Sequence, residues 1–285
     1  MGSPREALTA ELPLRDFLLY VSANRALLEM VHDTASFSLH VASVMRPKGE
    51  AVAEFETSSV GRMSSVARRE VEHGFPLLHG QALVGLWGAL EACIDDLSVL
   101  WLQCMEPQTR SDCLASLRVK LGEYLAVDED DRWGWILNQL RAGSAVLSPG
   151  LGQFENNLNA LGVGGQVDPN VRTTLFRAKA MRNLYAHRGG RADTKFLKEW
   201  PGHPAGLDEP VVVTRDQVIA TQIAMVLYAE TVSARILSLM GEPEKEIQLP
   251  PWIESTQDLL SLMKPSDKSL SGAPWSFHFE PRDEV

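Results

Sequence analysis

The chain has 285 residues, of which 45% are hydrophobic and 22% charged, a composition typical of a soluble globular protein with one large or two small domains. Its formal net charge of -10 argues against a general nucleic-acid binder, although a local basic patch is compatible with that charge. Its three cysteines contain no Cys-x-x-Cys pair, which argues against a disulfide framework and a zinc site.

The compartment predicted from the sequence is the cytoplasm. The first residues carry no apolar core of the kind that a signal peptide needs. The longest apolar helix is interrupted by Gln222 and Glu230, so we expect no membrane span and no membrane partner. The odd number of cysteines also fits a reducing compartment.

The first predicted element is a helix from Leu12 to Met45, with apolar positions at helical spacing. The segment 50–74 is polar and rich in serine, and both a helix and an ordered linker are consistent with it. We group residues 1–75 as an N-terminal helical region, to which the sequence assigns no function.

A helix from Gln81 to Met105 has the clearest pattern, because its apolar positions alternate in steps of four and three, as in a packed bundle helix. These positions are Leu83, Trp87, Leu90, Ile94, Leu97 and Trp101. We expect Gly85 and Gly88 beside them to let another helix approach closely. Glu91 either orients Arg182 or is an exposed carboxylate, the commoner role for Glu.

Four consecutive acids, 128–131, separate a predicted helix at 107–125 from an apolar helix that begins near Trp133. A metal-dependent nuclease could bind its ion through such carboxylates. Consecutive side chains point in different directions, however, so one ion cannot be coordinated by all four. Acids also stabilise the N-terminal dipole of a following helix. We favour this second role and predict no metal site.

Residues 154–161 form a short amphipathic segment between two glycine-rich stretches. These stretches are similar to nucleotide-binding loops only in composition, because neither follows a convincing strand and the Lys-Ser/Thr pair of a phosphate loop is absent from the sequence. We interpret them as turns and predict no cofactor.

The most informative stretch, residues 182–190, reads RNLYAHRGG. Asp168 and Pro169 predict the start of the helix that contains it, and the glycine pair predicts its end. His187 therefore lies in the last helical turn, where free carbonyl groups favour a protonated imidazole.

Asn183 lies four residues before His187 on the same helix face, so its amide can hold one ring nitrogen. Arg182 is about 140° away around the helix, so only its long side chain or a second subunit brings guanidinium and imidazole together. An acid/base group, an orienting amide and a cation shaped for phosphate are suited to chemistry on a phosphodiester.

Positive charge surrounds this stretch, because residues 171–198 hold eight basic residues and one acid, a net of +7. A phosphate-bearing ligand would meet such a patch. The residues that we predict to bind RNA are Arg177, Lys179, Arg188, Arg191 and Lys195. A solvated, arginine-rich helix face is the alternative explanation.

Residues 210–213 are consistent with a short extended segment, and Thr214 to Gln217 form a capping box that opens a long helix ending at Gly241. Without a strand pattern adequate for a sheet, the sequence predicts an all-α protein with an antiparallel helical bundle. The proline-rich residues 242–285 are expected to form a loosely ordered tail.

The chain resembles the HEPN family of all-helical proteins. The resemblance rests on Arg-Asn, three residues and His at a helix end, on the glycine pair and Asp193 that follow, and on the earlier helix with Glu91. It covers roughly Leu77 to Gly241 and divides the chain into residues 1–75, a HEPN-like bundle at 76–241 and the tail at 242–285.

Because many HEPN proteins are metal-independent endoribonucleases, the resemblance implies this activity. His187 would be the acid/base and Arg182 would stabilise charge on the pentacoordinate phosphorus. Asn183 would orient the ring or bind a phosphate oxygen. Tyr185 would stack on a base or, as we favour, fill the bundle. Attack by the 2′-OH would leave 2′,3′-cyclic phosphate and 5′-OH ends.

The resemblance also implies partners and a biological setting. It implies a homodimer in which two motifs form one composite cleft, and an RNA substrate, with tRNA as one candidate. HEPN nucleases often act as toxins or in antiviral defence, which adds an antitoxin or other regulatory protein as an expected partner.

Two alternatives stay open: a non-catalytic HEPN-like module that binds RNA, nucleotide or protein, and a purely structural dimerisation bundle. The Arg-to-His spacing alone is not specific, because Arg25 to His32 and Arg68 to His73 also satisfy it. If the motif is catalytic, we expect the side chains of Arg182 and His187 to be accessible to solvent in a shared cleft. A cap predicts His187 bonded to carbonyls of its own helix and Arg182 paired with an acid such as Glu91.

Overall fold

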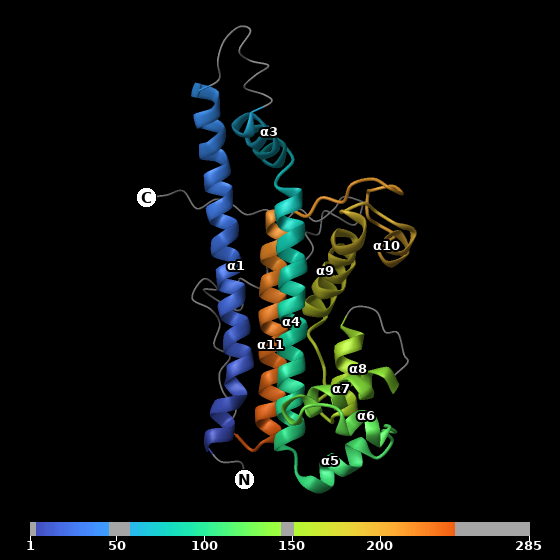
Figure 1. Ribbon diagram of the computed structural model, residues 1–285. Helices are drawn as coiled ribbons and strands as arrows, with labels where there is room; N and C mark the ends of the chain where they lie inside the picture. The colour runs from blue at the N-terminus through green and yellow to red at the C-terminus, as the bar shows by residue number, and fades with distance from the viewer. Residues whose placement is uncertain (1–3, 46–57, 144–150, 243–285) are drawn as a thin grey trace. The chain divides into compact units, whose positions relative to one another are not determined.

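The computed structural model describes residues 4–45, 58–143 and 151–242, and most of these residues are helical (Figure 1). Within these ranges the one β element is an isolated antiparallel bridge between Arg191 and Pro210. The predicted all-α helical bundle is confirmed, whereas the predicted tail lies, from residue 243 onward, outside the described residues. The helices are α1 (Pro4–Met45), α3 (Ser59–Glu72), α4 (Pro76–Cys104), α5 (Pro107–Leu114), α6 (Leu121–Leu125), α7 (Arg132–Gly143), α8 (Gly152–Ala160), α9 (Pro169–Arg188), α10 (Thr194–Glu199) and α11 (Arg215–Leu239), with a 3-10 turn, η1 (Glu129–Asp131), before α7.

The chain divides into two compact units that alternate along the sequence. Unit 1 comprises the described residues up to 20, from 87 to 179 and from 220 onward, and unit 2 comprises those from 21 to 86 and from 180 to 219. Helices α1, α4, α9 and α11 each contribute residues to both units. The division predicted from the sequence, at residues 75 and 241, cuts the chain into consecutive segments and so differs from these alternating units. It stays a prediction.

Most predicted helices are present, with some changes in their bounds. Helix α1 begins at Pro4 and continues through Pro13, and the undecided segment 50–74 contains α3. The prediction of one helix at 107–125 is wrong, since α5 and α6 are separate there. Neither of these short helices buries a residue, so no packed face holds a longer helix together.

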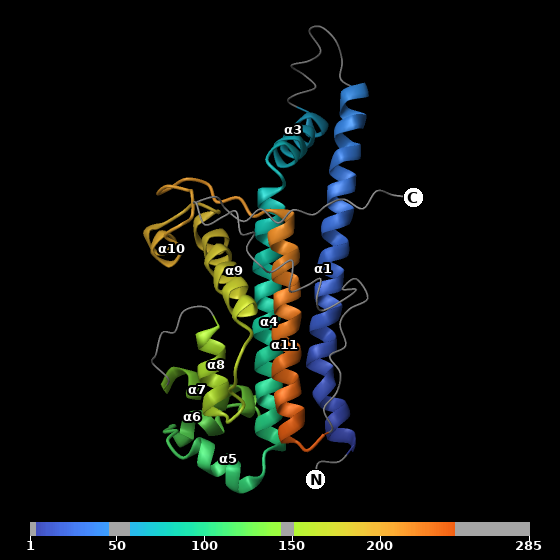
Figure 2. The ribbon, with the colours of Figure 1, turned by 180° about the vertical axis from the view of Figure 1, so that it is seen from behind.

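Unit 1 has an apolar core between the later parts of α4 and α11, which run side by side (Figures 1 and 2). Leu100 and Leu237 are buried together near the ends of the two helices. The indole N–H of Trp101 donates to the Leu161 carbonyl at 2.9 Å, which ties the turn after α8 to α4. All six apolar positions predicted for the α4 seam are buried.

A buried carboxylate, Glu155 on α8, organises the polar interior of unit 1. It accepts a hydrogen bond from the Tyr228 hydroxyl at 2.8 Å, and Nη1 of Arg235 lies 3.1 and 3.2 Å from its two oxygens. Nη2 of Arg235 donates to the Gln166 carbonyl at 2.7 Å. Burial raises the pKa of Tyr228, so its hydroxyl remains a proton donor. The pairing satisfies a charge that would be costly to bury alone.

In unit 2, the start of α4 and the end of α9 meet at one tight contact. A Cβ on Gly80 would lie 1.9 Å from Cδ1 of Tyr185, so the ring occupies the space that any other residue would fill. A Cβ on Gly190 would lie 3.0 Å from the same ring, and the Tyr185 hydroxyl donates to the Val211 carbonyl at 2.7 Å. An early residue of α4 thus meets a late residue of α9.

We expect Gly80→Ala to lower the free energy of unfolding by about 1–3 kcal/mol, because its methyl group collides with the Tyr185 ring. Gly88 is the matched control on the same helix. A Cβ there would meet nothing within 4 Å, so our expectation of a close helix approach at Gly88 is wrong. Gly88→Ala should therefore stabilise the protein by up to about 1 kcal/mol through helix propensity. Urea unfolding measures both, and equal effects would contradict this packing.

Candidate functional site

The helix that carries the central motif has the predicted ends. Oδ1 of Asp168 accepts hydrogen bonds from the amides of Asn170 and Val171 at 2.8 and 3.2 Å, which caps the first turn of α9. Gly189 and Gly190 follow the last helical residue with φ of +57° and +78°, a backbone conformation that favours glycine. The predicted helix is confirmed, and its final turn contains His187.

Arg182 and Asn183 form a bonded pair. Nη1 of Arg182 donates to Oδ1 of Asn183 at 3.1 Å, and both side chains are half-buried. The His187 side chain is exposed, and among the described residues no hydrogen bond joins it to Asn183. With its amide oxygen bonded to the guanidinium, Asn183 retains its amide N–H groups, which can donate to a ring nitrogen or a phosphate oxygen.

The two other Arg-to-His pairs use their histidines differently. Nδ1 of His73 lies 2.8 Å from the Arg69 carbonyl, so this imidazole caps the end of α3. Nε2 of His32 lies 3.1 Å from Nε2 of His79. A cap was one interpretation of His187; this cap is present at His73, whereas within the described residues the His187 ring has no such bond to a helix carbonyl.

A returning loop supports the chain just after α9. The amide of Val211 donates to the Gly190 carbonyl at 2.8 Å. Arg188 forms an ion pair with Asp208 at 3.1 Å, and Nη1 of Arg191 donates to the Asp208 carbonyl at 2.8 Å. Two arginines predicted to bind RNA thus also fix the loop, and both stay exposed. Surface pairs of this kind are weak enough for a phosphate to compete.

The remaining predicted RNA-binding residues fall in both units. Lys195 on α10 belongs to unit 2 and is exposed, with Nζ 4.0 Å from a carboxylate oxygen of Glu199. Arg177 and Lys179 belong to unit 1 and are half-buried. Burial lowers the pKa of Arg177, and Nζ of Lys179 lies 3.4 Å from Oε1 of Gln153. Unit 2 therefore brings together the motif, Arg188, Arg191 and Lys195.

Structural contacts are made by Tyr185, Glu91 and Asp193. Tyr185 fills the bundle, as we favoured, and burial raises its pKa to about 12. Glu91 lies in unit 1 and is half-buried, where it accepts a hydrogen bond from the Trp87 indole at 2.8 Å. Asp193 caps α10 by accepting from the Phe196 amide at 2.7 Å.

A pair formed by a buried and a half-buried histidine in unit 2 could not be seen in the sequence analysis. His79 lies 2% exposed at the start of α4, with Nδ1 2.8 Å from the Val213 carbonyl. A carbonyl only accepts, so Nδ1 carries the proton, and Nε2 of neutral His79 accepts from Nε2 of His32. The ring of Phe75, whose φ is +60°, packs on His32 with centroids 4.2 Å apart. The two histidines are 47 residues apart, so local spacing gives no signal of the pair.

The pKa of His79 is lowered to about 4, chiefly by burial and to a smaller extent by electrostatic repulsion from His32 and Arg215, whereas the hydrogen bond to the Val213 carbonyl raises it. The pKa of His32 is lowered by burial and by Arg215. Both imidazoles are therefore neutral at neutral pH.

In the described ranges, no group of three or more His, Cys, Asp or Glu side chains is arranged to hold a metal ion. The acidic run lies in and around η1, directly before α7, as the dipole argument predicts. None of the helices described is both long and apolar enough to cross a membrane.

Comparison with known proteins gives no match to a family model, to a curated protein or to a solved structure. The HEPN resemblance therefore rests on the motif residues themselves.

We expect the protein to lose stability as the pH falls from 6.5 toward 4, because the unfolded chain then binds a proton that folded His79 excludes. The loss approaches roughly 3 kcal/mol at the low end of this range. Urea unfolding at several pH values measures it. His79→Gln should flatten the profile, and His73→Gln, at an exposed position, should keep it. A profile unchanged by His79→Gln would contradict the assignment.

Proposed function

We propose that the chain is a metal-independent endoribonuclease of the HEPN type, with His187, Arg182 and Asn183 as its reacting groups. The observation that carries the proposal is the exposed imidazole at the end of α9, beside a bonded Arg182–Asn183 pair. In the two other Arg-to-His pairs, the imidazole is bonded to a carbonyl or to a second histidine.

The proposed reaction needs no metal-bound water, because RNA carries its own nucleophile. An imidazole takes the proton of the 2′-OH while that oxygen attacks the adjacent phosphorus. The bond from phosphorus to the 5′ oxygen breaks, and an imidazolium protonates this leaving oxygen. A homodimer would supply one His187 for each proton transfer, in the composite cleft that the resemblance implies.

Arg182 would stabilise the negative charge that develops on the phosphoryl oxygens. Its planar guanidinium can donate two parallel hydrogen bonds to a phosphate, which an ammonium group cannot do. The bond to Asn183 restricts the guanidinium before substrate arrives, and such preorganisation favours the transition state.

The basic residues near the motif would hold the RNA backbone. Arg188, Arg191 and Lys195 are exposed in the same unit as His187. Phosphate contacts of this kind position RNA without reading its sequence. The toxin or antiviral setting and an antitoxin partner remain part of this proposal and are supported by the resemblance. A cytoplasmic location is also part of it and is supported by the sequence features given above.

His187→Ala should lower RNA cleavage by on the order of 10²–10⁴-fold, the contribution of a general acid or base. Cleavage of total RNA and tRNA in excess EDTA measures this, with end mapping for 2′,3′-cyclic phosphate and 5′-OH ends. His73→Ala is the matched control, because it removes another exposed histidine near a helix end.

Cleavage by the His73→Ala variant should equal that of the wild type. Cleavage retained by His187→Ala would remove this histidine from the mechanism. A folded wild type that binds RNA without cleaving it would support the non-catalytic binding module instead.

Lys195→Gln should weaken RNA binding by a similar factor for different RNA sequences and lower the slope of log K against log salt by about 1. The reason is the loss of one phosphate contact from an exposed ammonium group. Lys120→Gln removes a similarly exposed lysine from unit 1 and should leave binding unchanged. Fluorescence anisotropy over a salt series measures both, and equal losses would contradict a localised RNA surface.

A further inference from the structure

The part of α1 in unit 2 has an apolar side in addition to its buried one. Val21 and Leu28 are buried against the unit. A second row of large side chains is exposed to between one half and three quarters of its surface. This row, the α1 outer stripe, consists of Leu27 (51% exposed), Met30 (58%), Phe37 (67%) and Val44 (73%), with half-buried Val41.

The α1 outer stripe has the spacing of a coiled-coil seam. Its members follow one another at intervals of three, seven, four and three residues, which places them at alternating a and d positions of a heptad. Thr34 occupies the remaining a position. A sustained repeat of this kind brings the same face of the helix back to a partner helix every two turns.

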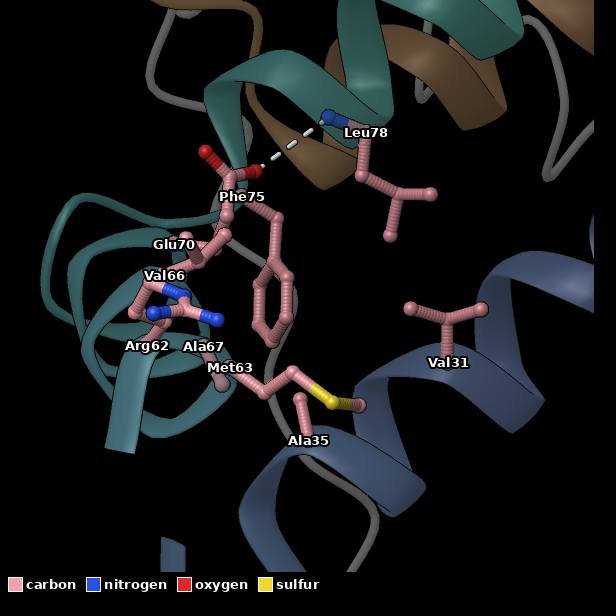
Figure 3. Close-up of a pocket in the computed structure, with 9 residues that line it drawn as sticks. All are labelled: Val31, Ala35, Arg62, Met63, Val66, Ala67, Glu70, Phe75 and Leu78. Atoms are coloured by element: carbon pink, nitrogen blue, oxygen red, sulfur yellow. Dashed lines mark hydrogen bonds between the residues drawn. The ribbon is translucent and has the colours of Figure 1, made fainter. Parts of the chain in front are cut away.

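A hollow apolar surface adjoins the α1 outer stripe. A cavity of about 430 Å³ opens between α1, α3 and the start of α4. Figure 3 shows Met63 of α3 and Val31 and Ala35 of α1 around it, with Phe75 just before α4 and Leu78 in the first turn of α4. Val31 lies one helical turn from Leu27 of the stripe. On α3, Val60, Met63 and Val66 are themselves exposed. Unit 2 therefore presents both protruding and hollow apolar features.

We propose that the α1 outer stripe binds the same stripe of a second copy of this chain. A second copy supplies a seam of identical length and period, as a two-stranded coiled coil requires. The described seam positions carry no charge, so two copies can pair without burying a charged side chain. Among the described flanking positions Asp33 is the residue with a formal charge, beside Ala26, Val31, Ser38 and His40.

The exposed area is sufficient for a dimer. With roughly 200 Å² for a large side chain, the exposed parts of Leu27, Met30, Phe37 and Val44 amount to on the order of 500 Å² per copy. Two copies would bury on the order of 1,000 Å², which is where specific protein interfaces begin. Exposed apolar patches of this size mark interaction sites on soluble proteins.

The proposed ribonuclease also uses two copies of the chain; this proposal assigns the contact between them to α1, and its test does not involve RNA. The test is the mass of the full chain in solution, measured by light scattering over a concentration series. The wild type should have the mass of a dimer, and Met30→Asp/Phe37→Asp should have half that mass. Leu121→Asp, which changes a residue 68% exposed on α6, is the matched control and should stay dimeric.

Circular dichroism checks that each variant keeps its helical content, and Phe37→Ser provides a milder change if the double variant loses it. The melting temperature of the wild type should also rise with protein concentration, because dimerisation stabilises the folded state. A wild type that is monomeric at every concentration would overturn the proposal. A dimer of unchanged affinity in the Met30→Asp/Phe37→Asp variant would do so as well.

Discussion

The fit of the Tyr185 ring between Gly80 and Gly190 is the contact on which the candidate site depends. The ring fixes the end of α9 to the start of α4, and its hydroxyl holds the returning chain at Val211. The same returning chain pairs with the residues just after α9. The final turn of α9 is therefore held firmly on its inner side, while His187 on its outer side stays exposed.

Burial decides which histidines of unit 2 are available for chemistry. His79 is enclosed, its Nδ1 is bonded to a backbone carbonyl, and its low pKa keeps it neutral. It suits a structural role, because a neutral imidazole satisfies buried polar groups without a charge. His187 has the opposite environment, with exposure, a helix C-terminus and an adjacent Arg182–Asn183 pair. Two histidines of one unit thus lie in different environments, and the reacting role is proposed for His187 alone.

The sequence predicted what depends on local chemistry. Asp168, the glycine pair after α9 and the capping box at Thr214 each act within a few residues, and the helix ends follow them. Contacts between distant residues could not be predicted, because the spacing of residues along the sequence does not show which distant residues meet in the fold. Gly80 rather than Gly88 admits another helix only because Tyr185, far along the chain, packs there. The pairing of His32 with His79 depends on the fold in the same way.

The central claim is that the exposed end of α9 binds a phosphodiester at His187. The most direct test is to follow the histidine side-chain NMR resonances during titration with an RNA oligonucleotide that lacks the reactive 2′-OH, with His187→Gln used to assign the signal. If RNA binds at this end of α9, the His187 resonance should show a saturable shift and the His73 resonance should change little. Saturation of binding with the His187 resonance unmoved would contradict it, because RNA would then bind elsewhere.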